Sequence, residues 1–166
     1  LGFLPFLGAA PLFDWDEINF AESAREMLVS GNYFQVQINF EPFWEKPPLF
    51  IWMQALSMKV FGVNAAAARL PNALLGIVTL LSLYRAGTRF KGQLFGRILA
   101  GFYFISLLPF LYFKSGIIDP TFNFLIFLGL LQIIRFEINA NETKREQLPY
   151  WAGFWIGLAT LTKGPV

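Results

Sequence analysis

Long stretches without a charged residue are separated by short charged segments along the whole chain. The four longest uncharged stretches cover residues 70–84, 98–113, 120–134 and 147–162. A helix needs about 20 largely apolar residues to cross a bilayer, because about 30 Å of hydrocarbon is divided by a rise of about 1.5 Å per residue. Together with their neighbours, the stretches predict membrane-spanning helices over about 65–84, 94–113, 120–136 and 150–166.

The first thirteen residues form another uncharged stretch. They lack the basic leading region of a signal peptide, and Pro5 and Pro11 interrupt them. We interpret residues 1–13 as the outer half of a membrane-spanning helix, which makes the chain a fragment with about five spans. A soluble helical bundle is the alternative, but its helices would carry polar residues at every turn, and these stretches are apolar on all sides.

Basic residues gather in two of the connections between the predicted spans. The first connection holds Arg85, Arg89, Lys91 and Arg97, and the second holds Arg135, Lys144 and Arg145. The predicted spans over 94–113 and 120–136 separate the two connections, so both connections lie on the same side of the membrane. An excess of Lys and Arg marks the cytoplasmic side. The long connection over residues 14–64 is therefore expected on the outer side.

This outer segment carries seven of the eleven carboxylates, and it predicts two short helices. The first begins near Asp16, which is expected to cap it, and closes at Gly31. The second covers residues 49–60, with Leu56 and Val60 on its apolar side. Twelve residues are too few to span a bilayer, so we place this helix in the plane of the membrane interface.

Composition narrows the function classes. Of 166 residues, 55% are hydrophobic and only 14% are charged, which excludes a disordered chain. There is no Cys and no His, which excludes disulfide scaffolds and thiolate or imidazole metal sites. The net charge of +2 is too small for nucleic-acid binding. The expected fold class is an all-α polytopic transmembrane bundle with two juxtamembrane helices in its first outer loop.

Charged clusters on the outer side are the candidates for chemistry. Three of them occupy residues 14–17, 45–48 and 119–120. Asp119 precedes a wholly apolar span, where an ionised carboxylate is costly unless a cation, water or ligand pairs with it. Lys163, at the outer end of the last predicted span, is a second such case. Helix capping for Asp16 and phospholipid contact for Lys46 are the structural alternatives.

Several short motifs occur in a characteristic order: Asp16-Glu17, Ala21-Glu22, Ala24-Arg25-Glu26-Met27, Ser30-Gly31, Glu45-Lys46-Pro47, Phe61-Gly62, Arg69-Leu70-Pro71, Asp119-Pro120 and Leu161-Thr162-Lys163-Gly164. In this order and spacing the chain resembles polyprenyl-phosphate-sugar-dependent glycosyltransferases of the GT-C superfamily. It is similar to the branch that contains dolichyl-phosphate-mannose protein mannosyltransferases and bacterial aminoarabinose lipid A transferases. The resemblance covers essentially all 166 residues, as the N-terminal part of a longer enzyme.

The resemblance implies a membrane enzyme that transfers a hexose or pentose, with inversion, from a polyprenyl-phosphate donor to a protein or lipid glycan acceptor. The catalytic acid/base role falls on Asp16, a supporting role on Glu17, and a further catalytic acidic position on Asp119. Such a transfer needs a carboxylate that activates the acceptor and cations that stabilise the departing phosphate.

The family's Glu-Lys-Pro motif matches Glu45 and Lys46, which implies substrate binding by both and contact of Lys46 with the carrier phosphate. Lys163 matches the lysine of the Thr-Lys-Gly motif and is a third substrate-binding candidate. A divalent metal is associated with some relatives, and Glu45 is the matching ligand, but one carboxylate does not make a metal site.

The implied location is a bacterial inner membrane, in contact with its lipids, with the active site on the periplasmic face. Two other functions stay open from the residues. One is a transporter or flippase of lipid-linked sugars, although the paired repeats of transporters are not visible in the chain. The other is a non-catalytic membrane scaffold whose acidic outer loop docks a partner.

Overall fold

The computed structural model describes residues 2–13, 15–138 and 145–164. Asp14 and Lys144 of the sequence-based predictions, and positions 1, 165 and 166 at the ends of two predicted spans, lie outside these residues. The elements are α1 (Asp16–Ser30), β1 (Gln37–Ile38), β2 (Glu41–Pro42), α2 (Leu49–Phe61), α3 (Ala65–Lys91), α4 (Gln93–Ile105), α5 (Leu107–Phe113), α6 (Asp119–Ile138), the 3₁₀ turn η1 (Arg145–Gln147) and α7 (Leu148–Lys163).

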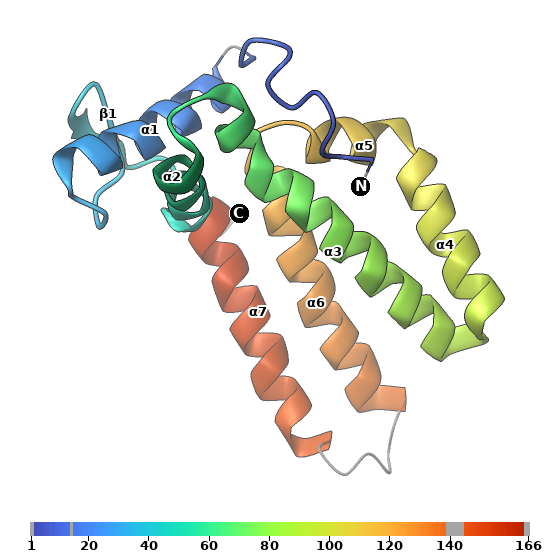
Figure 1. Ribbon diagram of the computed structural model, residues 1–166. Helices are drawn as coiled ribbons and strands as arrows, with labels where there is room; N and C mark the ends of the chain where they lie inside the picture. Colours follow the sequence, from blue (N-terminus) through green and yellow to red (C-terminus); the bar gives the residue numbers. More distant parts are fainter. Residues whose placement is uncertain (1, 14, 139–144, 165–166) are drawn as a thin grey trace.

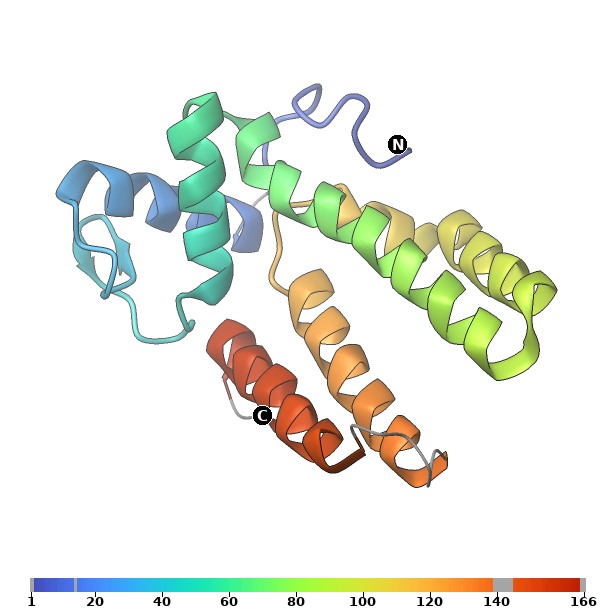
Figure 2. The ribbon, with the colours of Figure 1, turned by 60° about the horizontal axis from the view of Figure 1, so that its bottom comes forward.

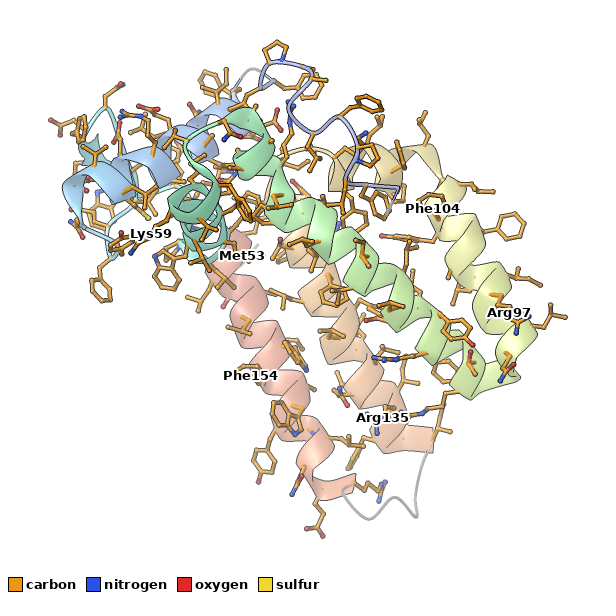
Figure 3. The ribbon with its side chains drawn as sticks, viewed as in Figure 1. Met53, Lys59, Arg97, Phe104, Arg135 and Phe154 are labelled. Atoms are coloured by element: carbon orange, nitrogen blue, oxygen red, sulfur yellow. The ribbon has the colours of Figure 1, made fainter. Side chains whose placement is uncertain are left out.

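The helices fall into a long-helix region and a cap. Helices α3, α4, α6 and α7 form the first region, in which α3 packs on α4 and α6 packs on α7, while α1, α2 and the hairpin sit together at one end (Figure 1). Figure 2 shows the same cap from a view turned by 60°. Arg97 and Arg135 mark the opposite end of the helices (Figure 3). One basic residue from each of the two basic connections thus lies at the end of the long helices away from the cap.

Both short helices of the outer segment are confirmed, with one correction. Helix α1 ends at Gly31, which adopts φ 71° and donates its N–H to the carbonyl of Met27. Its N-cap is Trp15, with φ 65° and no side-chain capping bond, so Asp16 is the first helical residue rather than the cap. Helix α2 leaves Leu56 and Val60 about two-thirds exposed, on the side that faces away from the cap's core.

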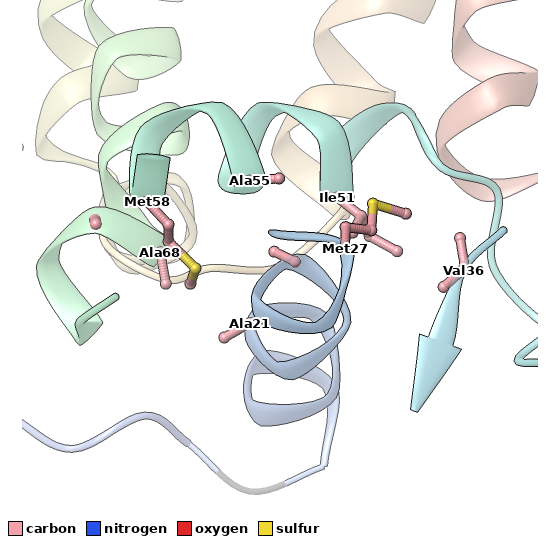
Figure 4. Close-up of a cluster of buried hydrophobic side chains, with 9 residues drawn as sticks. Ala21, Met27, Val36, Ile51, Ala55, Met58 and Ala68 are labelled. Atoms are coloured by element: carbon pink, nitrogen blue, oxygen red, sulfur yellow. The ribbon is translucent and has the colours of Figure 1, made fainter. Parts of the chain in front are cut away.

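Small side chains let the cap pack closely. Its core is formed where α1 crosses α2 and the start of α3, by Ala21, Ala24, Met27, Val36, Ile51, Ala55, Met58, Ala67 and Ala68 (Figure 4). Alanine side chains are small enough to allow helix backbones to approach each other, and the flexible side chains of Met27 and Met58 pack among them in this cluster. The antiparallel hairpin β1–β2 adds to the cap, and its turn is fixed by Glu26 Oε2, which accepts the N–H of Phe40 at 2.8 Å.

The predicted number of spans is not confirmed. By length and composition, two helices in the described part of the chain can cross a membrane, α3 with 27 residues and α6 with 20. The predicted span over 94–113 is instead broken into α4 and α5, which are bent by 72°. Pro109 has no N–H to donate to the carbonyl of Ile105, so the helix does not continue through Ser106. Counted as one span, this pair makes a third. Helix α7, over the last predicted span, has 16 residues.

The prediction of a partial helix over residues 1–13 is wrong for the described residues 2–13, which form turns and irregular backbone. Pro5 and Pro11 remove two donors that a helix would need. The segment is instead anchored by Phe3, 1% exposed, whose ring centroid lies 5.3 to 5.7 Å from those of Phe104, Phe110 and Phe113.

A proline within α3 leaves a backbone carbonyl of that helix available for a hydrogen bond from α2. Pro71 has no N–H, so the carbonyl of Ala67 lacks its helical donor. That carbonyl accepts the hydroxyl of Ser57, on α2, at 2.7 Å. The next carbonyl, that of Ala68, accepts the amide of Gln54, also on α2, at 2.9 Å. Two buried polar side chains of α2 therefore bind the helix backbone beside the proline.

Candidate functional site

Glu17 and Arg69 form a buried ion pair between α1 and α3. Arg69 Nε and Nη2 donate to Glu17 Oε1 and Oε2, each at 2.8 Å, which is the two-pronged geometry of strong guanidinium–carboxylate pairs. The side chain of Glu17 is 1% exposed and that of Arg69 is 4% exposed. The pair therefore lies inside the protein, with no face open to a large substrate.

Every donor and acceptor of this pair has a partner. The remaining three N–H groups of Arg69 go to the carbonyls of Leu7, Ala10 and Pro11, at 2.7 to 2.9 Å. Glu17 also accepts the backbone N–H of Phe13 at 2.7 Å and that of Gly116 at 2.5 Å. The pair thus fastens the non-helical start of the chain and the connection before α6 onto α1 and α3.

These contacts determine the ionisation of Glu17. Burial alone raises the pKa of its carboxyl, but the hydrogen bond from Arg69 and the two backbone N–H groups stabilise the carboxylate more strongly. The net result is a pKa of Glu17 below its ordinary value. The carboxylate is therefore charged at neutral pH, which suits a group that positions its neighbours.

Asp119 and Lys163, predicted separately as charged groups next to apolar spans, pair with each other. Lys163 Nζ donates to Asp119 Oδ1 at 2.6 Å, which joins the first residue of α6 to the last residue of α7. The two side chains keep 34% and 38% of their surface exposed, Asp119 the smaller share. Unlike Glu17 and Arg69, they can be reached by a ligand.

The Glu45-Lys46-Pro47 motif lies beside the Thr-Lys-Gly motif. A side-chain carbon placed on Gly164 would lie 3.9 Å from Pro47 Cγ, and α2, which follows the first motif, contacts α7. Glu45 is exposed and Lys46 is half-buried. In the described part of the chain, neither of them has an ion-pair or hydrogen-bonding partner.

Asp16 is exposed at the start of α1, directly before buried Glu17. Glu17 in turn binds Gly116, three residues before Asp119. The structure thus brings the Asp16-Glu17 motif close to Asp119, through the bond from Gly116 to Glu17. It brings the Glu45-Lys46-Pro47 motif close to Lys163, through the approach of Pro47 to Gly164. Among the described residues, neither Glu45 nor Lys46 has a hydrogen bond or ion pair with Asp16.

Sequence reasoning missed the buried polar residues that support this arrangement. Gln54, Asn72 and Glu26 are all 0% exposed. A signal was present in two of these cases. Asn72 lies near the start of the uncharged stretch 70–84, and Gln54 interrupts an apolar helix, so each stands where an unpaired polar group would be costly.

The metal prediction finds no support among the residues present. Over 2–13, 15–138 and 145–164, no three side chains of His, Cys, Asp or Glu come together as a metal ion would need. Glu45, the predicted ligand, is an exposed single carboxylate. The described residues therefore do not provide the ligand set that a divalent metal needs.

Comparison with known proteins gives consistent matches. The sequence profile of the dolichyl-phosphate-mannose-protein mannosyltransferase family matches residues 45–166. An uncharacterized protein of Aquifex aeolicus is 31% identical over 151 residues, which are 90% of this chain and 30% of that protein. An undecaprenyl phosphate-alpha-4-amino-4-deoxy-L-arabinose arabinosyl transferase of Shewanella sediminis is 29% identical over 161 residues, 95% of this chain and 29% of its own length.

The fold also matches solved structures. Crystal structures of ArnT from Cupriavidus metallidurans, in the apo state and bound to undecaprenyl phosphate, each superpose with a TM-score of 0.91 at 23% identity. Each match covers 98% of this chain and 30% of the ArnT chain. This chain therefore spans less than a third of the length of the relatives and solved structures that it matches.

Proposed function

Because the chain belongs to the dolichyl-phosphate-mannose-protein mannosyltransferase family, we propose that it is part of a membrane glycosyltransferase that takes its sugar from a polyprenyl-phosphate donor. The exposed Asp119–Lys163 ion pair, next to the Glu45-Lys46-Pro47 motif, is the observation that carries the proposal. It gathers a carboxylate and cations at one end of apolar helices, where the phosphate of a lipid carrier would lie. Relatives named for undecaprenyl-phosphate aminoarabinose transfer support the same donor class.

The proposed chemistry assigns one role to each exposed group. Asp16 accepts the proton of the acceptor hydroxyl as its oxygen forms a bond to the anomeric carbon of the sugar. The bond between that carbon and the carrier phosphate breaks at the same time, which inverts the configuration. Lys46 stabilises the negative charge that develops on the departing phosphate, as a compact ammonium does well.

The remaining groups hold this arrangement. Asp119 orients the ammonium of Lys163, at 2.6 Å, toward the donor phosphate. Glu45 binds the donor beside Lys46. Glu17 has a supporting role: its closed pair with Arg69 fixes the start of α1, and with it the backbone that carries Asp16.

We place the site on the periplasmic face of a bacterial inner membrane, with a protein or lipid glycan as the acceptor. The clustering of basic residues at the opposite end of the helices supports this orientation, because that end then lies in the cytoplasm. The chain would contribute the N-terminal part of the enzyme, the first outer loop and the helices that follow it.

Sugar transfer by the full-length protein in proteoliposomes tests the proposal. The donors are undecaprenyl phosphate carrying aminoarabinose and polyprenyl phosphate carrying mannose. We expect Asp16→Asn to lower transfer about 10²-fold or more, the usual contribution of a positioned acid or base. The control is Glu22→Gln, which removes a partly exposed carboxylate from the same helix, where it forms an ion pair with the neighbouring Arg25.

Each alternative predicts a different result. Undiminished transfer by Asp16→Asn would reject its catalytic assignment. Donor that crosses the bilayer without forming a glycoside would favour a transporter. A full-length protein that neither transfers nor translocates either donor, although correctly inserted, would favour a scaffold and reject the proposed function.

A further inference from the structure

A short non-helical segment, residues 115–118, connects α5 to α6 and lies inside the protein. Ser115 is 8% exposed and Ile118 is 2% exposed, and Gly116 is buried as well. Ile118 packs against Phe20 of α1 and Phe50 of α2. A buried irregular segment has backbone groups that no helix satisfies, so each of them needs another partner.

Three helices supply those partners through side chains. Glu17, on α1, accepts the N–H of Gly116 at 2.5 Å. Gln54, on α2, donates its amide to the carbonyl of Gly116 at 3.3 Å, besides its bond to α3. Asn72, on α3, donates one amide group to the carbonyls of Ser115, at 2.8 Å, and Ile117, at 2.7 Å.

Asn72 has the most complete set of contacts. Both amide hydrogens go to segment 115–118, and its Oδ1 accepts the hydroxyl of Thr121, in the first turn of α6, at 3.2 Å. The side chain is 0% exposed. A single residue of α3 therefore holds both the end of the connection and the beginning of the next helix.

The fit around Gly116 leaves little freedom of movement. A side-chain carbon built there would lie 3.0 Å from Gln54 Nε2 and 3.3 Å from both the carbonyl of Ala68 and Glu17 Cγ. The backbone of segment 115–118 is thus enclosed by α1, α2 and α3. Asp119, which follows directly, begins α6 from this fixed position.

We propose that Asn72 is a positioning residue for Asp119: through segment 115–118 and Thr121 it fixes the first turn of α6 and so holds Asp119 at Lys163. Gln54 and Glu17 complete the same anchor from the other two helices. The catalytic part of this inference rests on the proposed function, whereas the positioning part concerns geometry alone. Two readouts therefore separate them.

The first readout is chemical and independent of sugar transfer. Asp119→Cys and Lys163→Cys are introduced together in the full-length protein, and the rate of linking by a short bis-methanethiosulfonate reagent is measured in membranes. The 166 residues contain no native cysteine to compete in this part of the protein. We expect Asn72→Leu to slow the linking at least 5-fold, because the carbonyls of Ser115 and Ile117 lose their donor.

The second readout is kinetic. With Asp119 and Lys163 intact, Asn72→Leu is expected to lower kcat at least 10-fold and to change the donor KM less, because misplacing a catalytic group by about 1 Å costs up to about 10²-fold in rate. Thr79→Val is the matched control: Thr79 is 5% exposed on the same helix, and its hydroxyl bonds within that helix to the carbonyl of Leu75. It should change neither readout more than 2-fold.

Thr121 provides a milder test in case Asn72→Leu does not fold. Thr121→Val removes the hydroxyl that Asn72 accepts, and it should lower both rates, whereas Thr121→Ser keeps the hydroxyl and should restore them. Unchanged linking in both Asn72→Leu and Thr121→Val would overturn the positioning. Slowed linking together with full transfer activity in Asp119→Asn would retain the positioning and reject the proposed role of Asp119.

Discussion

Lys163 Nζ lies 2.6 Å from Asp119 Oδ1, although 44 positions separate the two residues in the chain. The pair joins the first residue of α6 to the last residue of α7, and these two helices pack on each other. Each charge, costly beside an apolar span, is thus compensated by the other. Because both side chains stay partly exposed, the pair can exchange this contact for one with a substrate.

The pair should matter more for activity than for stability. Lys163→Met is expected to lower sugar transfer by the full-length enzyme at least 10-fold. The same change should lower the free energy of unfolding by less than about 1 kcal/mol, since partly exposed pairs contribute little. Comparing transfer rate with thermal stability in detergent checks both. A loss of stability that matches the loss of activity would show that the pair is structural.

In the proposed function Lys46 contacts the donor phosphate already in the bound donor, so its loss should weaken donor binding in addition to slowing the departure of the phosphate. We expect Lys46→Gln to raise the donor KM about 10-fold or more, because a hydrogen bond to a charged group is worth about 1.5–3 kcal/mol and about 1.4 kcal/mol corresponds to tenfold in affinity. Steady-state kinetics with varied donor measures this. Lys59→Gln, at the far end of α2, is the control and should leave KM within 2-fold.

Removing one partner of the buried Glu17–Arg69 pair should destabilise the protein strongly. Arg69→Met leaves the carboxylate of Glu17 buried without its cation, and the expected loss is about 3–5 kcal/mol. Arg25→Met removes the partner of Glu22 from an exposed position on α1, where the loss should stay below about 1 kcal/mol. Melting temperatures of the two variants in the same detergent provide the comparison.

The same pair predicts a dependence of stability on pH. The pKa of Glu17 is lower in the folded protein than in the unfolded chain, because Arg69 and two backbone N–H groups outweigh the effect of burial. Its stabilising contribution is therefore present at neutral pH and is lost as the pH falls below about 4.5, through the lowered folded-state pKa. Thermal melts between pH 7 and 3 should fall less steeply for Glu17→Gln than for the wild type. Parallel curves would contradict this.

Two glycines of α4 should respond differently to the same change. A side-chain carbon on Gly96 would lie 2.5 Å from the carbonyl of Tyr84 on α3, whereas one on Gly101 would meet nothing within 4 Å. We expect Gly96→Ala to destabilise the α3–α4 contact by about 1–3 kcal/mol. Gly101→Ala should be neutral or stabilise by up to about 1 kcal/mol, because alanine favours a helix. Thermal stability of both variants measures the difference.

The sequence predicts those features that depend on neighbours along the chain. Uncharged stretches place α3, α6 and α7, and Gly31 marks the end of α1. Prolines explain where the predicted spans are wrong. Pro5 and Pro11 lie in a segment that is not helical, and Pro109 lies beside the break between α4 and α5. Hydropathy, which takes no account of the missing N–H of proline, predicts spans over both 1–13 and 94–113.

Contacts between distant residues could not be predicted from the pattern. Asp119 and Lys163 are recognisable separately as costly charges, but their pairing follows from the packing of α6 on α7. Likewise, the burial of Glu17 depends on Arg69, 52 positions away, and on the folded path of residues 2–13. An acidic residue beside Asp16 looks like a solvated one until that packing is known.

The bend between α4 and α5 has a consequence for the surrounding bilayer. The 13 residues of α4 rise about 20 Å, roughly 10 Å less than the hydrocarbon thickness. Helix α5 turns away by 72° and does not extend that length along the same axis. Such a hydrophobic mismatch is accommodated by local thinning of the lipid, so we expect headgroups next to α5 to sit lower than those next to α3. If the protein takes the lipid-borne donor proposed above, we expect its phosphate to lie deeper on the α5 side than on the α3 side.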